Sequence, residues 1–112
     1  MTKLQAVIQP PRFEAVKDAL LEIGVDGVTV SEVRGHGRQE GYTECYRGCG
    51  YTVDLLPKVK IETVVPDRLV DQAIQAITKA ARTGKTGEGK IFLTRVDEAI
   101  RIRTGDRGET AL

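Results

Sequence analysis

The residues best suited to chemistry lie in a glycine-rich segment, 84–90, with the sequence GKTGEGK. Three glycines in six residues allow backbone N–H groups to converge on an anion, and two lysine ammonium groups stand beside them. The spacing approaches the phosphate-binding pattern G-x-x-x-x-G-K, but Ile91 stands where that pattern has Ser or Thr to hold magnesium. The expected order is also helix, loop, strand instead of strand, loop, helix. We interpret the segment as an anion-binding loop; the alternative is an exposed flexible connection.

Two arginines, Arg101 and Arg103, follow this loop. In a strand, residues two apart face the same side, so each guanidinium group could pair with phosphate oxygens from one face. The chain has 17 Lys plus Arg against 16 Asp plus Glu, a net charge of +1, so a local cationic cluster indicates an anionic partner. The alternative is a solvated face neutralised by Asp97 and Glu98. The cluster comprises five cations over 22 positions: Arg82, Lys85, Lys90, Arg101 and Arg103.

A polar segment, 36–56, contains several glycines and no apolar periodicity, so we expect a long exposed loop. Tyr51, beside a glycine, is a candidate for modification or for anchoring a partner; alternatively it folds back onto the sheet. His36, Cys45 and Cys49 could form a metal or redox site, and the two cysteines could form a disulfide. We interpret them as ordinary thiols, because three ligands with this spacing are weak evidence for a metal.

Catalysis and nucleic-acid binding have little support in the composition. The chain has one histidine and no Ser-His or Cys-His arrangement on a rigid element. Its near-zero net charge argues against holding polyanions through bulk charge. An RNA-binding sheet would need aromatic residues on its central strands, and only Phe92 is available. We expect neither an enzyme nor a nucleic-acid partner.

Hydrophobic periodicity predicts strands and two helices. Val28 and Val30 would share the buried face of the second strand, Gly24 supplies a left-handed stop for the first helix, and Asp67 is a plausible cap of the second. The predicted elements are strands over residues 3–9, 27–34, 58–65, 91–96 and 100–103, and helices over 12–23 and 69–82.

The order β-α-β, long loop, β-α-β predicts a ferredoxin-like α+β sandwich whose helices both cover one sheet face. Polar alternation on the first and third strands suits a wet or inter-subunit surface on the other face. At 112 residues and 12.3 kDa the chain is a single domain, 1–112. Within it we distinguish the long loop 36–56, the glycine-rich loop 82–90 and a basic carboxyl-terminal strand and tail over 101–112.

The sequence also predicts a compartment. No run of apolar residues is longer than three, whereas a membrane span needs about 18. No basic stretch followed by an apolar run opens the chain, so no secretory signal is expected. Two cysteines make no disulfide framework. We expect a cytoplasmic protein.

Several motifs in a fixed order resemble the PII nitrogen signal-transduction family. Residues 35–39 read GHGRQ, residues 43–48 read TECYRG and residues 56–62 read LPKVKIE. Residues 83–92, TGKTGEGKIF, and 100–105, IRIRTG, continue the match. The resemblance runs from the first strand to the tail without an evident gap.

The resemblance implies a homotrimer of ferredoxin-like subunits that binds ATP or ADP in clefts between neighbours. The phosphates would be held by Arg38, Gly87, Gly89, Lys90, Arg101 and Arg103, with Gly37 in the same nucleotide-binding set. The adenine side would be lined by Val7, Thr29, Gly35, Glu62 and Val64.

The same resemblance implies a second effector, 2-oxoglutarate. Gln39 would bind it through a Mg²⁺ ion that the ATP phosphates also hold, and Lys58 would pair with its distal carboxylate. The implied mechanism is a conformational switch, in which ligands shift the population of the long loop and target proteins bind that loop. ATP with 2-oxoglutarate would report nitrogen shortage, and ADP the opposite.

Implied targets are ammonium transporters and the enzymes or kinases that control glutamine synthetase. Arg47 would plug the cytoplasmic exit of a transporter, which would be the only contact with a membrane. Tyr51 matches the nucleotidylated tyrosine of the family, where a bulky anionic group would block docking.

This chain departs from the family pattern at two positions of interest. Cys49 replaces the serine of the phosphorylated branch, so no phosphoserine control is expected, and Glu88 replaces a commoner aspartate with its charge retained. Two alternative functions are a nucleotide-hydrolysing enzyme and an adenine-nucleotide sensor without a 2-oxoglutarate response, which would take a redox input through Cys45 and Cys49.

Overall fold

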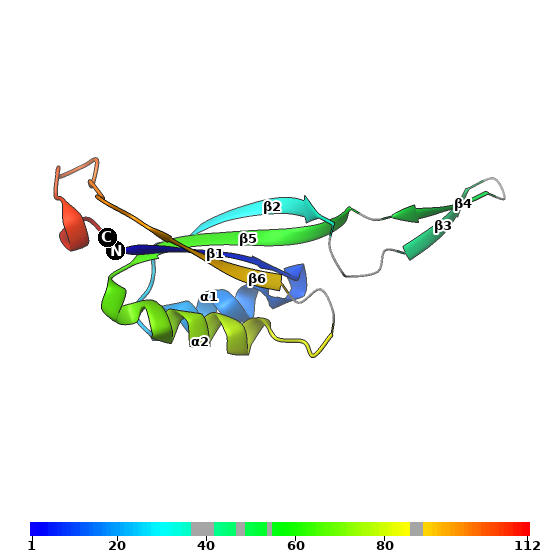
Figure 1. The fold of residues 1–112 in the computed structure, drawn as a ribbon, viewed down its shortest axis with the longest axis horizontal. Coiled ribbons are helices and arrows are strands. Elements are labelled where there is room, and N and C mark those ends of the chain that lie inside the picture. Colours follow the sequence, from blue (N-terminus) through cyan, green and yellow to red (C-terminus); the bar gives the residue numbers. More distant parts are fainter. Residues whose placement is uncertain (37–41, 47–48, 54, 86–88) are drawn as a thin grey trace.

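A four-stranded antiparallel sheet with two helices on one face forms the body of the protein (Figure 1). This computed structural model describes residues 1–36, 42–46, 49–53, 55–85 and 89–112. The strand order is β2-β5-β1-β6, which confirms the predicted ferredoxin-like sandwich. The elements are β1 (Thr2–Ile8), α1 (Phe13–Glu22), β2 (Thr29–Gly35), β3 (Tyr42–Tyr46), β4 (Cys49–Val53), β5 (Leu56–Val65), α2 (Val70–Ala81) and β6 (Gly89–Arg95).

The two central strands supply much of the core. β1 and β5 pair along the whole of β1, from Thr2 opposite Val65 to Ile8 opposite Val59. Along β1 and over residues 59–65 of β5, alternate residues are buried and the residues between them are half-buried, as the period-two pattern predicted. Ile61 is 1% exposed, and burying a side chain of its size stabilises the fold by about 1.5–3 kcal/mol.

Both helices pack on the buried face of this sheet, α1 through Val16 and Leu20 and α2 through Ala73 and Ile77. Gly24 ends the first of them, as predicted, with a φ of 87° that favours glycine. The N–H of Val25 donates to the Leu20 carbonyl (2.9 Å) and the N–H of Gly24 to the Leu21 carbonyl (3.0 Å). These two hydrogen bonds supply donors to carbonyls at the end of the helix that have no partner within it.

Strand β2 corrects the expectation for Val30. Val30 pairs with the buried Ile61, so it lies on the helix-covered side of the sheet as predicted, but it remains 42% exposed. The reason is its position on an edge strand, where the helices cover the sheet less completely. Val28 is half-buried.

The segment 36–56 is not a loop throughout, which corrects the expectation for it. β3 and β4 form an antiparallel hairpin, paired from Tyr42 opposite Val53 to Tyr46 opposite Cys49. Figure 1 shows this hairpin beyond the end of the sheet, away from the helices. Its aromatic and β-branched residues favour strands, but the glycines and the lack of apolar alternation obscured this signal in the sequence.

The predicted strand over 100–103 is also wrong. Ile100 makes one isolated bridge with Arg107, and residues 102–104 form a turn. The N–H of Gly105, with a φ of 75°, donates to the Arg101 carbonyl (2.7 Å) and closes this turn. The alternation of Arg101 and Arg103 therefore does not place their side chains on one face of a strand.

Asp67 does not cap the second helix; its carboxylate binds the start of the chain instead. Oδ1 accepts a hydrogen bond from the Thr2 hydroxyl (2.8 Å) and lies 3.2 Å from the amino terminus of Met1. The Thr2 hydrogen bond is the main reason that the pKa of Asp67 lies below its ordinary value of 3.8, and the amino terminus and Arg95 lower it further. Asp67 thus links β1 to the segment before α2.

We predict that Asp67→Asn destabilises the protein more at about pH 6 than at about pH 3. A carboxylate whose pKa is lowered by folding contributes stability above its unfolded pKa, and this contribution is lost as the pH falls through its folded pKa. Urea unfolding of both proteins at both pH values measures the difference between their free energies of unfolding. Asp18→Asn, which removes an exposed carboxylate on α1, is the control. An equal difference in unfolding free energy at both pH values would contradict a stabilising role for the Asp67 carboxylate.

Candidate functional site

Five of the predicted nucleotide-binding residues share the face of the sheet that the helices leave open. Leu4, Ala6 and Ile8 face the helices, so the alternate residues of β1, including Val7, face the other way. Register partners in antiparallel strands lie on the same side, and Val7 pairs with Lys60 of β5 and Lys90 of β6. The five predicted residues on this face are Val7, Thr29, Glu62, Val64 and Lys90.

The charges on this open face are partly paired. Glu62 lies 3.3 Å from the Lys60 ammonium and 3.9 Å from that of Lys3. All three side chains are about one-third exposed, so these ion pairs contribute little stability. Their main consequence is that Glu62 is neutralised within the chain, which leaves the face suited to a negatively charged ligand.

A pocket of about 600 Å³ lies at the end of the sheet where β1 begins. Thr29, Glu62 and Val64, which were predicted for the adenine side, all line it. The carboxyl-terminal segment contributes Ala111 and Leu112 to the same pocket. Its volume is within the range of small-molecule sites, and its mixed polar and apolar lining suits a heterocyclic base.

The predicted phosphate side begins at the opposite end, where β6 starts. Gly89 has a φ of 124°, and a Cβ at this position would overlap the carbonyl oxygen of Val7. Only glycine allows β6 to approach β1 this closely. Lys90 follows on the open face with its side chain exposed.

Arg101 and Arg103 do not join Lys90 within one chain, which corrects the expectation of a single cationic cluster. They follow the other end of β6, where Arg95 pairs with Thr2 at the start of β1, and Figure 1 shows this last segment of the chain beyond that end of the sheet. The Arg101 guanidinium donates to the main-chain oxygen of Leu112 (2.9 Å). Arg82 and Lys85 are exposed on the connection after α2. The cations that are close in the sequence are therefore not close together in the folded chain.

The segment around the β3–β4 hairpin holds several of the predicted residues. For β3 and β4 the backbone is described, and its register pairs Tyr51 with Glu44, Cys45 with Gly50 and Cys49 with Tyr46. The two cysteines are thus not register partners. The residues that lie outside the described part of the chain are Gly37, Arg38, Gln39, Arg47 and Gly87. Their roles stay predictions.

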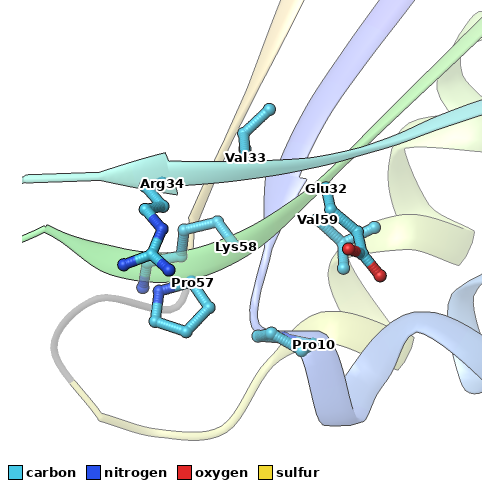
Figure 2. A pocket seen from close by; sticks show the side chains of 7 residues that line it. All are labelled: Pro10, Glu32, Val33, Arg34, Pro57, Lys58 and Val59. Carbon is cyan, nitrogen blue, oxygen red and sulfur yellow. The ribbon is translucent and has the colours of Figure 1, made fainter.

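The last two predicted residues, Gly35 and Lys58, lie together at the base of the hairpin. A Cβ on Gly35 would stand 3.5 Å from Cγ of Lys58, so the lysine stem passes beside the glycine. Burial lowers the pKa of Lys58. We call the adjoining pocket of about 440 Å³, between the end of β2, the start of β5 and Pro10, the β2–β5 pocket (Figure 2). Arg34 and Lys58 both line it, and the sequence analysis did not single out Arg34.

Comparison with known proteins identifies the family. The family model of nitrogen regulatory protein P-II matches residues 1–106. The chain belongs to the P-II family. Nitrogen regulatory proteins P-II from Rhodospirillum rubrum, Haemophilus influenzae and Azospirillum brasilense are 57%, 56% and 55% identical to it, each over 112 residues and the full length of both chains. This P-II chain is therefore a signal-transduction regulator, and these relatives are named as regulators and not as enzymes.

The helices of the P-II chain are short. In the described ranges, none has the length and apolar character that crossing a membrane requires.

We predict that Gly89→Ala destabilises the protein by about 1–3 kcal/mol or more, because alanine is strained at this φ and its Cβ overlaps the Val7 carbonyl. Gly27→Ala is the control, since nothing lies within 4 Å of a Cβ there and its φ is not in the left-handed region. Urea unfolding should show a change within about 0.5 kcal/mol for Gly27→Ala. Equal effects of the two substitutions would contradict the close approach of β6 to β1.

Proposed function

We propose that this P-II protein senses ATP or ADP together with 2-oxoglutarate at sites between the subunits of a homotrimer. The observation that most supports it is the division of the predicted residues between two ends of the sheet. Gly89 and Lys90 lie at the end nearer the hairpin, whereas Arg101 lies at the end that carries the 600 Å³ pocket of Thr29 and Glu62.

The length of β6 separates the two groups. Its seven residues, at about 3.4 Å each, put its ends about 20 Å apart. One triphosphate cannot contact Lys90 and Arg101 across that distance within a chain. A neighbouring chain can supply its own Arg101 to the Lys90 of the first, which would complete a cationic site for the phosphates.

The surface of β6 supports such an assembly. In the described part of the chain β6 pairs with β1 alone, so its other edge is open. Phe92 and Leu93 are 52% and 50% exposed, and Ile102 beyond the strand is fully exposed. Apolar side chains beside an open strand edge favour burial between chains.

The second effector would bind near the base of the hairpin. Gln39 would contact a Mg²⁺ ion held by the ATP phosphates, and Lys58 would pair with the distal carboxylate of 2-oxoglutarate. The position of Lys58 beside Gly35 supports this, because Gly35 belongs to the predicted nucleotide set. Mg²⁺ prefers oxygen ligands and is commonly shared with nucleotide phosphates.

Ligand binding would change the conformation of the segment around the β3–β4 hairpin. This segment would in turn regulate an ammonium transporter and the proteins that control glutamine synthetase. Arg47 and Tyr51 would contact or block these partners. The hairpin lies clear of the helices and the sheet, which supports a role in docking (Figure 1). The protein would act in the cytoplasm without catalysis and without nucleic acid.

Calorimetric titration tests this function. We expect 2-oxoglutarate to bind only when Mg-ATP is present, not with ADP, and Gln39→Ala to abolish this binding while ATP still binds, because the magnesium contact is lost. Gln72→Ala, an exposed glutamine on α2, is the control. Binding of 2-oxoglutarate without nucleotide, or an unchanged response in Gln39→Ala, would contradict the proposal. Turnover of ATP would indicate an enzyme instead.

A further inference from the structure

A buried threonine, Thr63, lies between two residues that were predicted for the adenine side, Glu62 and Val64. Thr63 is 4% exposed, and its hydroxyl donates a hydrogen bond to the main-chain carbonyl of Gly27 (2.7 Å). A buried hydroxyl requires such a partner, and a buried carbonyl requires a donor. Neither residue of this hydrogen bond belongs to the predicted nucleotide set.

This hydrogen bond joins two walls of the pocket of about 600 Å³. One wall is the α1–β2 connection, residues 24–28, and the other is the end of β5, residues 62–65. The β2–β5 register begins at Thr29 opposite Glu62, so Gly27 lies before the first register pair. The threonine hydroxyl therefore continues the connection between the two walls beyond the end of the paired strands.

The side chain of Thr63 lies behind the face that would hold the base. Thr63 pairs with Leu4 of β1, so it lies on the helix-covered side of the sheet. Successive residues of a strand point to opposite sides, so Glu62 and Val64 lie on the open face. This geometry suits a positioning role, in which Thr63 acts on a bound nucleotide through Gly27 and not by direct contact.

We propose that Thr63 is a positioning residue of the adenine pocket, which holds the α1–β2 connection at a fixed distance from β5. This inference rests on the nucleotide part of the proposed function. Gly27 has no side chain to pack, and glycine has the least restricted backbone, so its position depends on main-chain hydrogen bonds. A wall that is ordered before the ligand arrives reduces the free-energy cost of ordering it on binding. Without the hydroxyl, the separation of Thr29 from Val64 would be less well defined.

This role determines which ligands a loss of the hydroxyl affects. ATP and ADP share the adenosine group and differ in their phosphates, so a looser adenine pocket weakens both by the same factor. The proposed 2-oxoglutarate site lies four register positions away along β2 and β5, where Val33 pairs with Lys58. The affinity for 2-oxoglutarate at saturating Mg-ATP therefore stays the same. A loss of global stability alone would change none of these affinities, because they are measured on folded protein.

Calorimetric titration of Mg-ATP, ADP and 2-oxoglutarate into two variants tests the proposal. Thr63→Val keeps the shape of the side chain and removes its hydroxyl, whereas Thr63→Ser keeps the hydroxyl. We expect Thr63→Val to weaken ATP and ADP alike by about 3- to 10-fold, as loss of one neutral hydrogen bond does, and Thr63→Ser to keep most of the affinity. Thr2→Val is the matched control, because Thr2 is also buried but donates to Asp67 and does not line the pocket.

The outcomes separate this inference from the proposed function. If the unaltered protein binds neither nucleotide, both fail; if it binds nucleotide but not 2-oxoglutarate, the proposed function fails while ATP and ADP still decide the role of Thr63. Unchanged nucleotide affinities in Thr63→Val, an effect on only one nucleotide, or an equal loss in Thr2→Val would overturn that role alone.

Thermal unfolding verifies that each variant folds. If Thr63→Val does not fold, Thr63→Cys, which has a weaker donor, replaces it in the same titrations. Unchanged affinities in that variant would equally overturn the role.

Discussion

The alternation of buried and half-buried residues along β1 and β5 determines which face of the sheet forms the core and which face can contact ligands. One set of side chains, with Ala6 and Ile61 at its centre, packs beneath two helices and forms the core. The other set faces away from the helices and carries Val7, Glu62 and several lysines. Because no element in the described part of the chain covers that second face, it is available for ligands and for other subunits.

The predicted nucleotide residues lie at both ends of the sheet, so under the proposed function one chain alone does not complete a site. Lys90 is held at one end by the close approach of Gly89 to Val7. Arg101 is held at the other end by a turn and by the main-chain oxygen of Leu112. In the proposed trimer these two residues would meet only where two subunits contact each other, so nucleotide binding would depend on assembly.

Much of the fold could be predicted because alternation in β1 and β5 and the stop at Gly24 are local signals that tertiary packing reinforces. The hairpin was missed because its strands are short and their sequences, YTECY and CGYTV, have no period-two apolar pattern. Arg101 and Arg103 showed a period of two, which a turn satisfies as well as a strand. The β2–β5 pocket was missed because its lining comes from β2, β5 and Pro10, which only the folded chain brings together.

Mixed trimers test the shared site most directly. Chains with Lys90→Ala and chains with Arg101→Ala should each fail to bind ATP, since every site lacks one cation. When the two are unfolded and refolded together, about a quarter of the sites should combine an intact Lys90 from one chain with an intact Arg101 from its neighbour and bind ATP. Mixed trimers without restored binding, verified by differently tagged chains, would contradict the account.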